Sequence, residues 1–167
     1  MSNRRETTEM LSALVEKRLR SSGMFWAPEV NFDKGTPRNR RVDFVGFKPF
    51  TPNYVVEPAS VELGRFEFYE VKSCMADFKS GNGLTFYGDL NYLVTTREFA
   101  EELHQKIMLP RGVNGVLVPN KPRTALISAF LGMGEDQSYR KRQSSEMLWQ
   151  IMTARHHYDI GEGATDE

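Results

Sequence analysis

The chain has little cysteine, no long apolar run and no net charge. Its single cysteine, Cys74, excludes an intrachain disulfide and a zinc site built from several cysteines. No segment approaches the roughly 20 consecutive apolar residues of a membrane-spanning helix. The polar segment 1–9 lacks the apolar stretch of a signal peptide. These absences predict a cytoplasmic protein with no membrane partner.

Charge is balanced overall but unevenly distributed. The 22 Lys and Arg residues equal the 22 Asp and Glu residues, which argues against general binding to polyanions. Residues 1–41 nevertheless carry nine basic and five acidic side chains. Residues 159–167 carry four acidic side chains and no basic one. The N-terminal part of the chain therefore has an excess of basic residues that could form a local basic surface.

Length and composition predict one globular domain. The 167 residues are 40% hydrophobic and 26% charged, which is close to the average for globular proteins. A chain of this length suffices for one domain and is short for two. We therefore expect a single domain over residues 1–160, followed by a loose acidic tail at 161–167.

The spacing of apolar residues predicts the order of helices and strands. Apolar side chains at intervals of three and four predict helices over 6–20, 96–108 and 144–157. Runs rich in β-branched and aromatic residues predict strands over 24–32, 42–47, 65–73, 89–95 and 112–119. Pro28 indicates that the first strand lies at a sheet edge or contains a bulge. The order predicts an α/β fold.

Three charged residues interrupt the apolar strands. Glu70 and Lys72 are two positions apart in the strand 65–73, so their side chains project from the same face. Asp43 lies inside a second apolar strand. Such charges are costly to bury unless they are paired, solvated or bound to an ion. If the two strands are neighbours, Asp43, Glu70 and Lys72 can meet at one site.

Two carboxylates and an amine suit the hydrolysis of a phosphodiester. Mg²⁺ prefers oxygen ligands and is commonly held by one or two carboxylates together with water and substrate phosphate. The cation activates water and polarises the phosphoryl oxygens. A lysine beside it can orient the water or stabilise the charge that develops on the phosphate.

Asp43, followed by Glu70-Val71-Lys72 on the strongest strand, resembles the PD-(D/E)xK restriction-endonuclease-like superfamily. The run EVKSCMADF from Glu70 to Phe78 also resembles the MmcB-type DNA-repair family and small phage nuclease-like proteins. The resemblance extends over about residues 9–119. It implies a restriction-endonuclease-like core of order αβββαβ, with a mixed central β-sheet flanked by helices. Val42 stands where the superfamily often has a proline before the first acid.

The resemblance also implies DNA hydrolysis that depends on Mg²⁺ or Mn²⁺. It assigns as metal ligands Asp43, Glu70, the Val71 carbonyl and an outer acid, Glu9. Glu16 competes with Glu9 for that outer position on the first helix. Asp43, Glu70 and Lys72 would be catalytic, with Lys72 as the residue that orients water or stabilises charge.

Basic and polar residues near the three charged residues are candidate DNA contacts. Those before Asp43 are Arg38, Arg40 and Arg41, which can bind phosphates independently of sequence. Those after Lys72 are Ser73, Lys79 and Tyr87. The Tyr87 ring could stack on an unpaired base, or it could pack into the core.

Two other readings of the sequence remain open. A nuclease-fold module could bind DNA or a protein partner without cutting. Alternatively, an unrelated α/β domain could use the three charged residues for structure alone. The sequence does not distinguish endonuclease from exonuclease activity. It also leaves open the DNA structure recognised, the pathway and the oligomeric state, a homodimer included.

Overall fold

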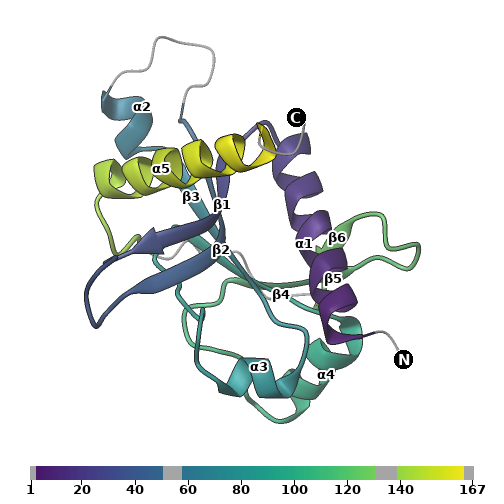
Figure 1. Cartoon of the computed structure of the whole chain (residues 1–167). Helices are drawn as coiled ribbons and strands as arrows, with labels where there is room; N and C mark the ends of the chain where they lie inside the picture. The colour runs from purple at the N-terminus through teal and green to yellow at the C-terminus, as the bar shows by residue number, and fades with distance from the viewer. Residues whose placement is uncertain (1–2, 51–57, 131–138, 164–167) are drawn as a thin grey trace.

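The computed structural model describes residues 3–50, 58–130 and 139–163, and it contains a six-stranded mixed sheet (Figure 1). The strands follow one another across the sheet in chain order. They are β1 (Phe25–Phe32), β2 (Arg40–Lys48), β3 (Arg65–Val71), β4 (Leu90–Val94), β5 (Gly115–Pro119) and β6 (Leu126–Ser128). β3 pairs with β4, and β4 with β5, in parallel, whereas the other neighbours are antiparallel.

Helices lie on both faces of this sheet (Figure 1). They are α1 (Arg4–Ser21), α2 (Pro58–Glu62), α3 (Met75–Lys79), α4 (Arg97–Gln105) and α5 (Ser144–Gly163). α1 covers one face, and α3, α4 and α5 cover the other. The expected α/β class, with a mixed sheet between helices, is therefore confirmed. No helix in the described ranges is long and apolar enough to span a membrane.

α1 forms as its sequence pattern predicts. Asn3 caps its first turn, where its side chain accepts from the Arg5 N–H while Glu6 reaches back to the Asn3 N–H. The buried side chains recur at intervals of three and four, and they are Leu11, Leu14, Val15 and Leu19. This stripe packs on Phe44 of β2 and Tyr69 of β3. Burial of the stripe fixes the position of α1 across the sheet.

The opposite face carries two separate apolar clusters. One joins β1, β2 and the first half of β3 to α5, with Phe68 and Met147 at its centre. The other joins β4 and β5 to α3 and α4, through Leu93 and Leu103. Phe68 and residue 70 share this face, and Glu70 pairs in register with Leu93. Glu70 therefore lies on this face between the two clusters, beside Leu93 of the second cluster.

The observed boundaries differ from the predicted ones at chain ends and turns. β1 is an edge strand with Pro28 opposite Phe44, which confirms the expectation from that proline. α5 continues to Gly163, beyond the predicted helix end at 157 and into the region predicted as tail; 164–167 lie outside the described ranges. α2 and β6 were not predicted, because five and three residues are too short to show a periodicity.

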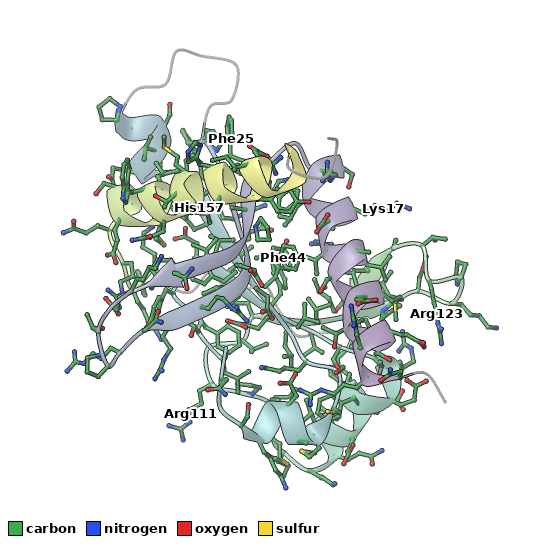
Figure 2. The ribbon with its side chains drawn as sticks, viewed as in Figure 1. Lys17, Phe25, Phe44, Arg111, Arg123 and His157 are labelled. Carbon is green, nitrogen blue, oxygen red and sulfur yellow. The ribbon has the colours of Figure 1, made fainter. Side chains whose placement is uncertain are left out.

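Phe68 and Phe25 allow the core to be tested. Phe68 is fully buried and its ring lies 5.7 Å from that of Phe32, whereas Phe25 is 63% exposed. Figure 2 shows a similar contrast between Phe44, inside the molecule between the sheet and α1, and Phe25 at the periphery.

We predict that Phe68→Ala lowers the free energy of unfolding by about 3–5 kcal/mol, because it removes a large buried ring and leaves a cavity. Phe25→Ala should change it by less than about 0.5 kcal/mol. Urea unfolding followed by circular dichroism measures both. Equal losses in the two variants would contradict this placement of the core.

Candidate functional site

Strand register brings Asp43 beside Glu70. β2 and β3 are antiparallel, with Val45 opposite Phe68 and Phe44 opposite Tyr69. One further step of the same register places Asp43 opposite Glu70. At this point a side chain takes the place of backbone pairing between β2 and β3, since Asp43 Oδ2 accepts a 2.7 Å hydrogen bond from the Val71 N–H. Asp43 is thereby fixed at the end of β3.

Glu70 and Lys72 are both buried at this end of β3. Glu70 is 0% exposed, and its Oε1 accepts a 3.3 Å hydrogen bond from the Thr85 N–H. Its Oε2 is buried and accepts no hydrogen bond from the described residues. Lys72 is 5% exposed, and its Nζ donates to the Asn82 carbonyl at 2.5 Å. The structure thus brings Asp43, Glu70 and Lys72 together, as the sequence pattern predicted.

The environment favours the neutral form of the two carboxyl groups. Burial raises the pKa of Glu70 well above its ordinary value, and the negative charge of Asp43 raises it further, while the Thr85 N–H and Lys72 oppose the shift. Burial also raises the pKa of Asp43, against the Val71 N–H and Lys72. The two adjacent carboxylates repel each other when both are ionised, and Lys72 is a positive charge that favours ionisation of both. A cation placed between them would favour ionisation of both.

A cleft of about 830 Å³ opens over Asp43 and Lys72. Basic, hydroxyl and backbone groups surround it, namely Arg4, Thr8 and Ser12 of α1, Arg40 and Arg41 of β2, and Asn82 and Gly83. Glu70 lies beneath this lining rather than in it. The cleft lining therefore combines basic residues with three acids, Glu29, Asp43 and Asp77.

Asp77 is a site residue that the sequence did not reveal. It lines the cleft from the first turn of α3. Its Oδ1 lies 3.2 Å from an Arg4 nitrogen and 3.7 Å from Lys72 Nζ. Asp77 therefore connects α1, α3 and the buried lysine. The sequence signal for Asp77 was its place in the EVKSCMADF run, but that run does not indicate which side chains Asp77 contacts.

Glu9 does not occupy the position expected of an outer metal ligand. It is exposed, and its Oε1 accepts a 2.8 Å hydrogen bond from Arg5. Glu16 lies 3.7 Å from Arg20. The described residues that line the cleft include neither acid. The reason is helical phase, since the α1 residues facing the cleft are spaced by four, and Glu9 is rotated about 100° from its neighbour Thr8.

The candidate DNA contacts before Asp43 divide into two groups. Arg40 and Arg41 line the cleft, and Arg41 also lies 3.6 Å from Glu29. Arg38 belongs to the exposed turn between β1 and β2, outside the cleft lining. Arg40 and Arg41 are therefore the two arginines of this run that can reach a ligand in the cleft.

The candidates after Lys72 lie away from the cleft lining. Tyr87 packs against Phe32 and Phe68, with the Arg142 guanidinium 4.8 Å from its ring centre. Of the two roles expected for this ring, it therefore has packing into the core rather than exposure for base stacking. Lys79 is exposed at the end of α3. Ser73 Oγ is buried and has no hydrogen-bond partner among the described residues.

Comparison with known proteins supports the fold and leaves the function open. No protein-family model matches the chain, and no curated protein matches it. The chain is similar to the solved structure of SPO1766, a protein of unknown function from Silicibacter pomeroyi. That match has 21% sequence identity and a TM-score of 0.60, and it covers 96% of this chain and 92% of the other. At this identity the likeness shows a shared fold alone.

The raised pKa of Glu70 predicts a stability that falls as pH rises. Above pH of about 4.3, the ordinary pKa of a glutamate, the folded chain binds more protons than the unfolded chain. The stability contributed by protonated Glu70 is therefore fully present below that pH and is lost as pH rises through the folded pKa. Glu70→Gln, which is always neutral, should remove most of this pH dependence.

Urea midpoints between pH 4.5 and 8.5 measure the effect. Glu9→Gln is the matched control, because Glu9 is an exposed carboxylate on α1 and its replacement should leave the wild-type slope unchanged. Parallel pH profiles for wild type and Glu70→Gln would show that burial of Glu70 does not affect stability.

Proposed function

We propose that the protein is a deoxyribonuclease of the PD-(D/E)xK type that depends on Mg²⁺ or Mn²⁺ and has a restriction-endonuclease-like core. The observation that carries the proposal is the meeting of Asp43, Glu70 and Lys72 at one end of β3. The order of α1, β1, β2 and β3, with the acids on the second and third strands, fits the expected core. An arginine-lined cleft over the three residues fits a phosphate-bearing substrate.

The donor atoms at the site suit a hard divalent cation. Glu70 Oε2 is a buried acceptor without a partner among the described residues, and the Asp43 carboxylate lies beside it. No group of three or more His, Cys, Asp or Glu side chains placed to hold a metal occurs in the described ranges. Mg²⁺ needs no such group, because water and substrate phosphate complete its coordination. Asp43 and Glu70 would hold the cation, with the Val71 carbonyl as a further oxygen.

The bound cation would supply Lewis-acid polarisation of the phosphate and activation of water. Lys72 contributes a positive charge at a fixed position, since its backbone N–H donates to the Val94 carbonyl and its carbonyl accepts from Thr95 Oγ1. A buried ammonium acts through a low local dielectric, which strengthens its interaction with developing negative charge. Lys72 would therefore stabilise the transition state or orient the attacking water.

The cleft walls suit a nucleic-acid backbone. Arg4, Arg40 and Arg41 line an opening of about 830 Å³, with Arg4 3.2 Å from Asp77 and Arg41 3.6 Å from Glu29, and Ser12 adds a hydroxyl group. Contacts of these types bind phosphate and sugar without reading bases. DNA is the partner that we propose on this basis.

A nuclease-fold module that binds without cutting is the second candidate. The observation that favours it is the complete burial of Glu70, which leaves this carboxylate outside the cleft lining. The arginine rim would remain available for binding in such a module. The two candidates differ in whether a divalent cation binds and whether DNA is cut.

Glu70→Ala and Lys72→Ala should fail in different ways. Glu70→Ala removes a metal ligand, so Mn²⁺ binding and plasmid nicking should both be lost. Lys72→Ala keeps both carboxylates, so Mn²⁺ should still bind while nicking slows about 10²- to 10³-fold. Lys79→Ala, on the exposed end of α3, is the control and should retain wild-type nicking. Calorimetry and nicking of supercoiled plasmid measure the two properties.

Wild-type protein that binds DNA but cuts neither duplex, branched nor single-stranded substrates in Mg²⁺ or Mn²⁺ would favour the binding module. Unfolding of Lys72→Ala, together with no effect of Mg²⁺ on wild type, would instead assign the three residues a structural role.

Arg40 should contribute to DNA affinity and to its salt dependence. Removing one phosphate contact by Arg40→Ala should weaken binding and reduce the slope of log K against log salt by about one unit. Arg38→Ala is the matched control, because Arg38 lies two residues away but outside the cleft lining. Fluorescence anisotropy across a salt series measures the slopes. Identical slopes for the two variants would remove the arginine rim from the interface.

A further inference from the structure

Residues 80–85, which we term the strap, cover the buried carboxylate at the end of β3. The strap leaves α3 after Lys79 and returns to the core at Thr85 and Phe86, which are 3% and 7% exposed. Asn82 and Gly83 within it line the cleft. Glu70 lies below them with no exposed surface. The strap therefore separates Glu70 from the cleft over Asp43 and Lys72.

Close approach of Gly83 accounts for this separation. A Cβ atom at position 83 would lie 2.9 Å from Glu70 Oε2 and 3.5 Å from Lys72 Nζ. A contact of 2.9 Å is shorter than real Cβ atoms show, so only glycine fits here without displacement of a neighbour. Gly83 also has a φ of +73°, which favours glycine. The backbone at Gly83 thus occupies the space in front of Glu70 Oε2.

Backbone groups of the strap also engage the functional atoms beneath it. The Asn82 carbonyl accepts from Lys72 Nζ, and the Thr85 N–H donates to Glu70 Oε1. A cation at Glu70 and a phosphate at Lys72 would require these same atoms. The closed strap and a loaded site therefore compete for Glu70 and Lys72.

The middle of the strap bonds mainly to the end of α3 and to itself: the Ser80 and Gly81 N–H groups donate to α3 carbonyls, and the Asn82 N–H donates to Ser80 Oγ. Its link to the site is the hydrogen bond from Lys72 Nζ to the Asn82 carbonyl. Ser80, Gly81 and Asn82 are exposed, in contrast to the buried residues at the start and end of the segment, Phe78 and Thr85. Gly81 has a φ of +70°, and nothing lies within 4 Å of a Cβ built on it. Glycines on both sides of Asn82 adopt a positive φ at little cost, which other residues do only rarely. The strap can therefore turn outward, with the Thr85 N–H leaving Glu70, while Phe78 and Phe86 on either side of it stay buried.

We propose that the strap is a gate, which excludes a divalent cation from Glu70 when closed and turns outward about Gly81 and Gly83 when the cation binds. The proposal rests on the proposed function, since the cation is the one that this function requires. A gate that is closed in most molecules lowers the apparent cation affinity in proportion to the open fraction. Destabilising the closed state should therefore tighten cation binding.

Gly83→Ala and Gly81→Ala form a matched pair of variants. Both place alanine at a positive φ, but only Gly83→Ala also brings a Cβ against Glu70. Gly83→Ala should open the strap, so that the Thr85 amide exchanges with solvent at least fivefold faster in the absence of metal. Its Mn²⁺ affinity by calorimetry should rise about five- to tenfold relative to wild type. Gly81→Ala strains the same segment without touching Glu70, so both quantities should also rise, but less than in Gly83→Ala.

The two measurements separate the gate from the proposed function. Equal exchange rates and equal Mn²⁺ affinities in wild type and Gly83→Ala would overturn the gate while leaving a metal-dependent nuclease intact. Faster exchange in Gly83→Ala, with no Mn²⁺ binding to wild type or to either glycine variant, would overturn the proposed function and the role of the strap as a cation gate.

Wild-type protein provides a test that needs no variant, in case Gly83→Ala does not fold. Saturating Mg²⁺ should release the Thr85 amide from Glu70 and speed its exchange, whereas the Lys72 amide, which donates to the Val94 carbonyl, should stay protected. Unchanged or slower exchange at Thr85 when Mg²⁺ is bound would overturn the gate.

Discussion

The hydrogen bond from the Val71 N–H to the Asp43 carboxylate determines the arrangement of the site. It replaces the next ladder bond between β2 and β3, so the strands end their pairing where the acidic side chains begin. It also fixes Asp43 opposite Glu70 with one oxygen committed to the backbone. The carboxyl group of Glu70 then has no place on its face except the gap between two apolar clusters.

Burial at this gap is energetically unfavourable and is only partly compensated. Glu70 Oε1 accepts a hydrogen bond from the Thr85 N–H, while its Oε2 accepts none from the described residues. Lys72 supplies a nearby positive charge, and its Nζ donates to the Asn82 carbonyl and lies 3.7 Å from Asp77 Oδ1. Burial raises the pKa of both acids, and a cation bound between them would stabilise their ionised forms. This capacity to accept a cation is the physical basis for proposing catalysis.

Sequence reasoning succeeded where chain periodicity alone decides geometry. Period two placed Glu70 and Lys72 on one face, and short apolar strands indicated that Asp43 could lie on a neighbour. It failed for Glu9, because the side of α1 that lines the cleft carries Arg4, Thr8 and Ser12 and no acid, so the helical phase could not be read from the acids. Asp77 and Gly83 were missed because their importance depends on contacts with Arg4 and Glu70, which follow from the folded path of residues 72–85.

Anomalous diffraction from crystals soaked in Mn²⁺ tests most directly the claim that the end of β3 is a divalent-cation site. The account predicts a strong peak between the carboxylates of Asp43 and Glu70, with residues 81–83 displaced from their position over Glu70. Absence of a peak at this site, with Glu70 still beneath Gly83 at a saturating Mn²⁺ concentration, would contradict it.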